Sequence, residues 1–298
     1  MIPETQLDTW AKQGATSSPK ETHEFIRNAL SEYEFPEDVK YEVYLQGSYK
    51  NNTNIYADSD VDIVVELIST FKHNLPVEEA KSAGFSKATY FLNDFRTDVM
   101  KALRKKYNIS DNFKDYISSG CKSIKVDPKG NKRKADVVVS MQYRNYSSQK
   151  NYKEGIIFSN ACNDAEIINY PELHYQNGVQ KHSEDRTNGW FKPTVRIFKN
   201  ARNKIKENKP FLDAPSYFLE CLLFNVPDEE FGTNYQTTVP NVLNWLSDKL
   251  NDQKESWKDL KCQNQMLEVF GYNNTQWGIT DARSFVSDFI NLWNNWNK

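Results

Sequence analysis

The pattern of apolar and polar positions divides the chain into a mixed α/β first half and a helical second half. Apolar residues at helical spacing predict an amphipathic helix over 18–33 and a longer helix over 76–107. Short runs rich in β-branched residues predict strands at 41–45, 63–67, 123–126 and 135–141, and the turn sequence DPKGN at 127–131 makes the last two strands a hairpin. After about residue 185 the pattern is almost wholly helical, with helices expected near 191–205, 217–226, 242–250 and 285–296.

These elements predict an α+β fold. We expect a mixed sheet lobe with a long N-terminal helix over residues 1–185, packed on a helical lobe over residues 186–298, with a cleft between the two lobes. A chain of 298 residues that is 38% hydrophobic is long enough and apolar enough to bury a core of this size.

Charge and composition narrow the range of partners. A net charge of -2 gives no overall field for binding a long nucleic acid, so none is expected as a partner. No apolar run approaches the length of a membrane span, and the first residues lack a secretory pattern, so we expect no membrane partner and a cytoplasmic location. The four cysteines have no metal-binding spacing and are expected to be reduced, small core residues (Cys121, Cys162, Cys221 and Cys262).

Acidic residues at the starts of two apolar strands are the strongest chemical feature of the sequence. Asp60 and Asp62 precede the strand at 63–67, and side chains two apart on a strand point the same way. Asp136 opens the strand at 135–141 in a similar manner. Because neighbouring carboxylates repel unless a cation lies between them, three converging aspartates predict a site for two Mg²⁺ ions, with Mn²⁺ as a substitute.

Gly47 and Ser48 follow the strand at 41–45, upstream of the acids. A glycine after a strand lets the backbone approach a phosphate closely, and the serine hydroxyl adds a donor. The sequence contains neither a Walker A motif nor GxGxxG, so phosphate binding by a P-loop or a Rossmann fingerprint is not expected.

The combination of Leu45, Gly47-Ser48 and Asp60-Val61-Asp62-Ile63 resembles the DNA polymerase β type nucleotidyltransferase superfamily, with Asp136 in the place of its third carboxylate. Within that superfamily the chain looks like a CD-NTase, a bacterial relative of cyclic GMP-AMP synthase, over about residues 18 to 296. The resemblance implies synthesis of a cyclic di- or oligonucleotide second messenger from NTPs (ATP, UTP or GTP) in anti-phage defence of the CBASS type. It also implies a downstream effector that is a separate protein.

The segments VRIFKNARNK (195–204) and APSYFLECLLFNVPDEEF (214–231) look like the parts of the helical lobe that bind the donor nucleotide in these enzymes. By position, the resemblance implies that Ser48, Lys199 and Ser216 contact the β and γ phosphates, and that Tyr217 stacks on the donor base. Asn169, in EIINYPELHYQNG (166–178), occupies the place where pyrimidine-selective members carry Asn, which implies use of UTP. His174 is more simply explained as a structural residue.

The resemblance also assigns roles to the acids: Asp60 and Asp62 would bridge both metal ions, and Asp136 would hold the catalytic ion and assist deprotonation of the attacking hydroxyl. Two other functions remain open on the sequence. The first is a nucleotidyltransferase that modifies an RNA end or a protein side chain, which would use the same metals. The second is a non-enzymatic nucleotide sensor that kept the fold.

Overall fold

The computed structural model describes residues 1–14, 17–56, 60–108, 115–130, 132–148, 150–273 and 275–296. The chain forms two compact units. The sheet unit contains Thr16–Tyr49 and Ser59–Pro171, and the helical unit contains Met1–Ala15, Lys50–Asp58 and Glu172–Lys298. This division differs from the expected boundary at 185/186, because α1 (Glu4–Ala11) packs on helices from the C-terminal part of the chain and the segment after residue 49 joins the same unit.

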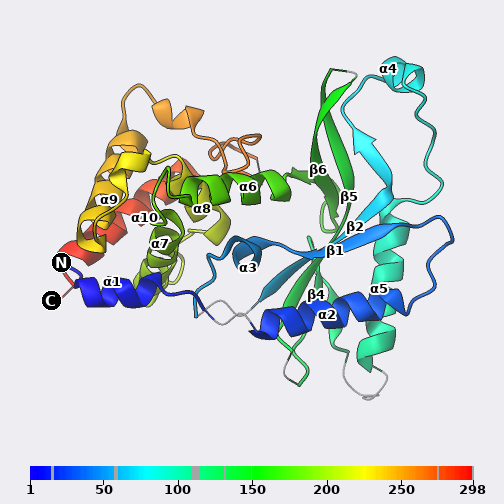
Figure 1. The fold of residues 1–298 in the computed structure, drawn as a ribbon, viewed down its shortest axis with the longest axis horizontal. Helices are drawn as coiled ribbons and strands as arrows, with labels where there is room; N and C mark the ends of the chain where they lie inside the picture. The colour runs from blue at the N-terminus through cyan, green and yellow to red at the C-terminus, as the bar shows by residue number, and fades with distance from the viewer. Residues whose placement is uncertain are drawn as a thin grey trace. The chain divides into compact units, whose positions relative to one another are not determined.

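The sheet unit has a seven-stranded mixed sheet, in the order β1-β2-β5-β4-β3, with β6 on β5 and β7 on β6. The strands β2 and β5 are parallel, and every other pair is antiparallel (Figure 1). The predicted hairpin is confirmed as β4–β5, although position 131 of its turn lies outside the described residues. The strands are β1 (Tyr41–Leu45), β2 (Val61–His73), β3 (Ile117–Ser119), β4 (Ile124–Val126), β5 (Ala135–Ser148), β6 (Asn151–Asn160) and β7 (Ala165–Asn169).

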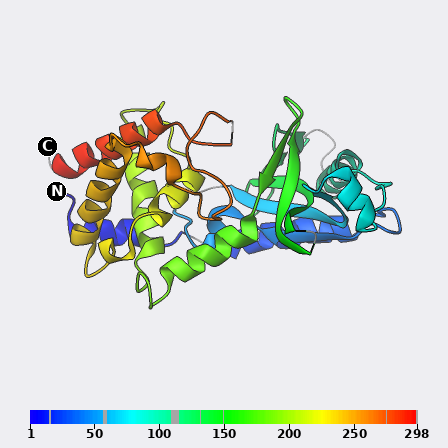
Figure 2. The ribbon, with the colours of Figure 1, turned by 90° about the horizontal axis from the view of Figure 1, so that it is seen from above.

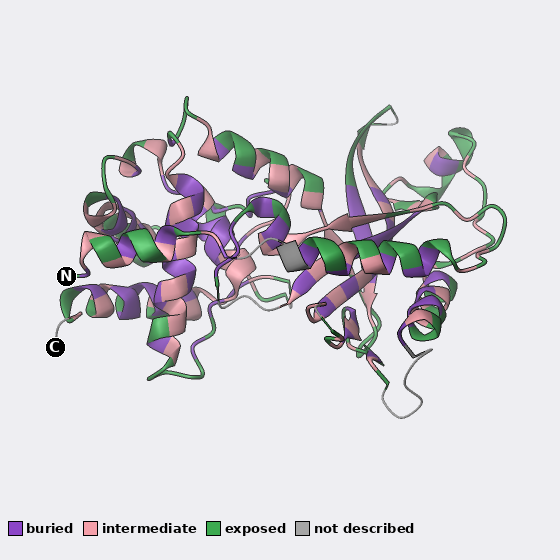
Figure 3. Ribbon diagram, turned by 60° about the horizontal axis from the view of Figure 1, so that its bottom comes forward, coloured by how far each residue is buried: buried purple, intermediate pink, exposed green. Residues whose placement is uncertain are grey.

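Two helices, α2 (Ser17–Ser31) and α5 (Leu92–Asn108), lie against this sheet (Figures 1 and 2). Their apolar residues pack with the odd-numbered positions of β2 and β5, such as Ile63 and Val137. Figure 3 shows exposed and buried positions alternating around α2, as expected for a helix with one face on a core. Since side chains alternate along a strand, the even-numbered positions of β2 and β5, which include the aspartates, face away from this core.

The helical unit is built around one apolar core formed by its helices and its irregular segments. In addition to α1, these are α6 (Pro171–His182), α7 (Phe191–Lys206), α8 (Ser216–Phe224), η1 (Asp228–Glu230), α9 (Tyr235–Asn251), η2 (Ser256–Asp259) and α10 (Ile279–Asn294). The α+β class is confirmed, with a mixed sheet in one unit and helices in the other. In the described part of the chain, no helix is both long and apolar enough to cross a membrane.

Two expectations are wrong. The single helix expected over 76–107 is two helices, α4 (Val77–Ser82) and α5, because Gly84 adopts a positive φ of 78° and ends the first helix. Cys121 and Cys162 form a disulfide between two turns of the sheet unit and are exposed, so only Cys221 and Cys262 are the buried free thiols that we expected.

Candidate active site

Two of the predicted catalytic aspartates lie on adjacent strands of the sheet unit. Asp62 of β2 and Asp136 of β5 are register partners in the parallel pair, so their side chains emerge side by side on one face. Asp60 comes immediately before β2, two residues from Asp62. Pairing of the two strands therefore brings together acids that are far apart in the sequence.

Two lysines that were not among the predicted site residues pair with these acids. Lys125, on β4, is the register partner of Asp136 on its other side, and its Nζ lies 2.7 and 2.6 Å from the two carboxylate oxygens. Lys134 Nζ donates to Asp60 Oδ2 at 2.8 Å. Hydrogen bonding to Asp60 raises the pKa of Lys134, and the charge of Asp136 raises it further, so Lys134 lies within electrostatic reach of both acids.

These contacts show how far the site suits divalent cations. Among the residues that the structure describes, no three His, Cys, Asp or Glu side chains are close enough together to hold a metal ion. The carboxylates of Asp60 and Asp136 instead hold ammonium groups, which act as stand-in cations. Carboxylate oxygens are the ligands that Mg²⁺ and Mn²⁺ prefer, so the chemistry of these side chains suits such ions, although their spacing in this structure does not.

Gly47 lies so close to Asp62 that its position has no room for a side chain. It begins α3 (Gly47–Asn51) with φ of +67°, and a Cβ atom at this position would lie 2.2 Å from Asp62 Oδ2. The preceding backbone N–H, from Gln46, donates to the carbonyl of Asp62 at 2.9 Å. The Gly47-Ser48 turn is therefore packed directly against one of the acids, and only glycine permits both the conformation and the close approach.

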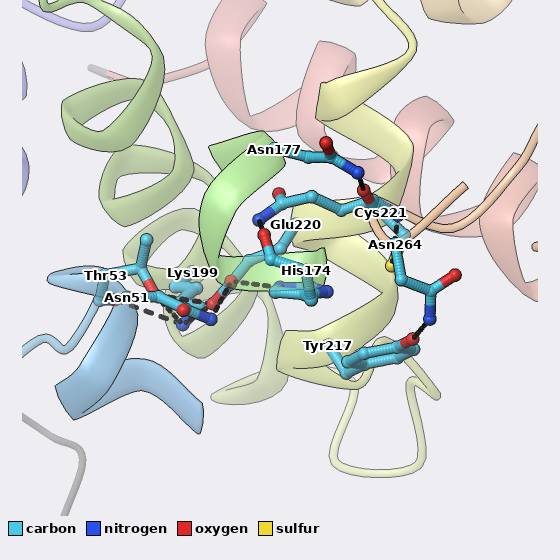
Figure 4. Close-up of polar contacts among 10 residues, drawn as sticks. Asn51, Thr53, His174, Asn177, Lys199, Tyr217, Glu220, Cys221 and Asn264 are labelled. Atoms are coloured by element: carbon cyan, nitrogen blue, oxygen red, sulfur yellow. Dashed lines mark hydrogen bonds and ion pairs between the residues drawn. The ribbon is translucent and has the colours of Figure 1, made fainter. Parts of the chain in front are cut away.

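Lys199 lies in the helical unit and is completely buried, and Figure 4 shows its side chain beside those of Thr53 and Glu220. Its Nζ donates to Glu220 Oε1 at 2.8 Å and to the carbonyl and hydroxyl oxygens of Thr53 at 3.1 and 3.3 Å. These contacts use all three N–H bonds of the ammonium group. The predicted phosphate contact of Lys199 therefore requires that its ion pair with Glu220 first open.

Ser216 and Tyr217 begin α8. Ser216 Oγ accepts a hydrogen bond from Arg202 Nη1 at 2.8 Å, so the predicted phosphate ligand already lies beside a cation. Tyr217 stacks on His174, with ring centroids 5.2 Å apart and an interplanar angle of 22°, and its hydroxyl oxygen accepts from Asn264 at 3.2 Å. The tyrosine ring is thus fixed on one side by another ring.

Asn169 is the last residue of β7, opposite Ile156 of β6. Its Oδ1 accepts the backbone N–H of Tyr170 at 2.8 Å. Ile156 belongs to a second apolar cluster together with Val64, which shares its strand face with Asp62. Asn169 therefore lies at the edge of the same sheet face as the acids.

Two of the residues that were not predicted carry a signal in the sequence. The alternating pattern Ile124-Lys125-Val126 predicts a strand with one polar face, and that face meets Asp136. Glu220 is the single charge in the apolar run SYFLECLLF, a pattern that indicates a buried and paired carboxylate. The identities of their partners could not be obtained in this way.

The mixed sheet, with two aspartates in register on parallel strands beside a Gly-Ser turn, belongs to a fold of the nucleotidyltransferase class. Residues 176–294 match the model of the cGAS/DncV-like nucleotidyltransferase C-terminal helical domain. The chain is 45% identical to the cyclic UMP-AMP synthase of Rhodothermus marinus over 302 residues, covering 100% of this chain and 99% of that protein. The chain belongs to the CD-NTase family and is a nucleotidyltransferase with the polymerase β-like fold.

Other relatives agree with this assignment. The cyclic nucleotide synthase CdnE01 of Staphylococcus haemolyticus is 38% identical, with 99% of both chains covered. The solved structure of the Rhodothermus marinus CdnE c-UMP-AMP synthase with Apcpp and Upnpp matches with a TM-score of 0.90 and 44% identity, over 100% of this chain and 98% of that one. Divalent metal ions are generally used in this family.

Proposed function

We propose that this enzyme joins NTPs into a cyclic di- or oligonucleotide second messenger, using two Mg²⁺ ions for which Mn²⁺ can substitute. The observation that carries the proposal is the placement of Asp62 and Asp136 in register, with Gly47 packed against the first of them. The similarity to a cyclic UMP-AMP synthase over the full length of the chain supports the same chemistry.

The three aspartates would hold the metal ions. Bound there, the ions would supply the positive charge that stabilises attacking and leaving oxygens in nucleotidyl transfer. Asp136 would assist deprotonation of the attacking ribose hydroxyl, and pyrophosphate would leave as the new bond to the α phosphate forms. The hydroxyls of Ser48 and Ser216 would donate to the β and γ phosphates, and Lys199 would join them only after leaving Glu220.

Base recognition is proposed for two residues. The Tyr217 ring would stack on the donor base, because stacking accepts any base. The amide group of Asn169 would bind a pyrimidine edge, since it has both a donor and an acceptor. A uridine-containing product fits this assignment, and the relative named as a cyclic UMP-AMP synthase supports it.

We place the enzyme in the cytoplasm, in anti-phage defence of the CBASS type, where a separate effector protein would bind its product. Neither a membrane nor a long nucleic acid is part of this proposal.

The test is incubation of the purified protein with all four NTPs and either Mg²⁺ or Mn²⁺, followed by phosphatase treatment and mass spectrometry. We expect a phosphatase-resistant cyclic product from the wild type and none from Asp62→Asn or Asp136→Asn, both of which should remain folded. Asp115→Asn is the control. It changes a carboxylate of the sheet unit that pairs with Arg104 and has no proposed role at the site, so this variant should retain activity. Transfer of label to RNA or protein would favour the alternative acceptor, and NTP binding without pyrophosphate release would favour a sensor.

A further inference from the structure

A buried carboxylate on α8 holds together four side chains of the helical unit. Glu220 accepts hydrogen bonds from Thr53 Oγ1 at 2.5 Å, Lys199 Nζ at 2.8 Å, Asn51 Nδ2 at 3.2 Å and His174 Nε2 at 3.2 Å. Figure 4 shows these side chains converging on Glu220 from different segments of the chain. All five residues are at most 7% exposed.

The network is both charged and buried, so its members depend on one another. Burial by itself raises the pKa of the Glu220 carboxyl, but the charge of Lys199 and the hydrogen bond from His174 outweigh it and lower the pKa below its usual value. Removal of one partner from a buried ion pair leaves the other charge uncompensated, which is far more costly than replacement of both.

One side of the network reaches the residues proposed to bind phosphate. Asn51 is the last residue of α3, whose first turn carries Gly47 and Ser48, and Thr53 follows it. The hydrogen bonds from Asn51 and Thr53 to Glu220 therefore fix the C-terminal end of a helix of only five residues.

The other side of the network reaches the residues proposed to bind the base. Glu220 lies three and four positions after Tyr217 and Ser216 on α8, so the three side chains share one face of that helix. His174 bonds to Glu220 through Nε2 and stacks on the ring of Tyr217. A shift of the carboxylate would therefore be passed to the tyrosine through the histidine.

We infer that Glu220 is a positioning residue of the nucleotide site, which sets both the end of the Gly47-Ser48 helix and the orientation of Tyr217. Glu220 would act through these residues and not by contact with the nucleotide. This inference rests on the proposed function, because it assumes that Ser48 and Tyr217 contact NTP. It also gives Lys199 a second role, as the counter-charge that keeps Glu220 ionised inside the protein.

The test compares Glu220→Gln, Lys199→Met and the double variant Lys199→Met/Glu220→Gln with wild type. The melting temperature, the KM for each NTP and kcat are measured for these four proteins and for a control. Lys181→Met is the matched control, because Lys181 is another buried lysine of the helical unit, and the polar contacts of its side chain in the described part of the chain are with Asp228 and the carbonyl of Val226.

Each single variant at the network should raise KM about tenfold or more, because small misplacements of binding groups have large kinetic effects. The double variant should recover most of the lost melting temperature, because it removes both buried charges and the introduced amide oxygen still accepts hydrogen bonds. Lys181→Met should lower the melting temperature but leave KM within about twofold of wild type.

Two results would overturn the inference: Glu220→Gln with the KM of wild type, or Lys181→Met with a KM raised as much as in Glu220→Gln. A double variant with a melting temperature no higher than that of Lys199→Met would contradict the role of Lys199 as the counter-charge of Glu220.

Hydrogen exchange in the absence of nucleotide separates this inference from the proposed function. Amides of residues 50–54 should exchange faster in Glu220→Gln than in wild type or Lys181→Met. This result is expected even if the wild type forms no product, and unchanged exchange would refute the positioning role by itself.

Discussion

Replacement of Lys125 by methionine removes the ammonium group that contacts both carboxylate oxygens of Asp136. If a metal ion binds to Asp136, it must first displace this group, so the free energy of the ion pair is subtracted from that of metal binding. The two side chains are 38% and 22% exposed, which places the pair among the partly solvated ones. Such pairs contribute about 0.5–1 kcal/mol, equivalent to about two- to fivefold in affinity.

The measurement is a titration with Mn²⁺ alone, in which the electron paramagnetic resonance signal reports the free ion. We expect Lys125→Met to bind Mn²⁺ about two- to fivefold more tightly than wild type, because competition with the lysine is gone and a positive charge has been removed. Lys72→Met is the control, since Lys72 pairs with Glu166, a carboxylate of the sheet unit with no proposed metal. Unchanged or weaker Mn²⁺ binding in Lys125→Met, or an equal gain in Lys72→Met, would show that Lys125 does not occupy a metal position.

Three further predictions concern the sheet unit. Gly47→Ala should reduce product formation about tenfold or more, because the new methyl group would lie against Asp62, a proposed catalytic carboxylate. Gly84→Ala is the control: Gly84 has a similar φ and no described atom within 4 Å of the new methyl group, so this change should reduce only stability, and equal activities of the two variants would contradict the prediction. Burial, together with nearby carboxylates, raises the pKa of Glu66 to about 7 from 4.5, so its contribution to stability is present below pH 4.5 and is lost as pH rises through 7. Glu66→Gln should therefore be more stable than wild type by up to about 3 kcal/mol at about pH 8 but not at about pH 4, as measured by urea unfolding. The Cys121–Cys162 disulfide closes a loop with a sequence separation of 41, so its reduction by dithiothreitol should lower the free energy of unfolding of the wild type by about 2–4 kcal/mol. Dithiothreitol should not change the stability of the variant Cys121→Ser/Cys162→Ser. An unchanged stability of the wild type would argue against the bond.

Local pattern was sufficient for much of the fold, and its failures have identifiable causes. The paired strands of the β4–β5 hairpin follow from a turn sequence and β-branched residues close together in the chain. The prediction of one helix over 76–107 was wrong because it did not take Gly84 into account. The left-handed backbone of Gly84 ends α4 even though the apolar spacing on either side is helical. Strands β6 and β7 were missed because their pairing with β5 and with each other, more than their own sequence, makes them strands.

The disulfide illustrates a different kind of failure. Composition and spacing made all four cysteines look equivalent, since none has a metal-binding or redox motif. Cys121 and Cys162 lie in turns of separate hairpins, and only the order of the strands brings those turns together. A pairing of this kind depends on geometry beyond the reach of sequence spacing.

The sequence alone determined which groups are available for chemistry: aspartates at the starts of buried strands, and a glycine where the backbone must turn closely. Such choices are local, because the cost of burying a charge and the restriction on positive φ act on each residue where it stands. The tertiary structure decided which of these groups meet. It placed Asp62 beside Asp136, and it paired Lys125 with Asp136, Lys134 with Asp60 and the buried Lys199 with Glu220. The reason is that strand register and helix packing bring together residues that are far apart in the chain.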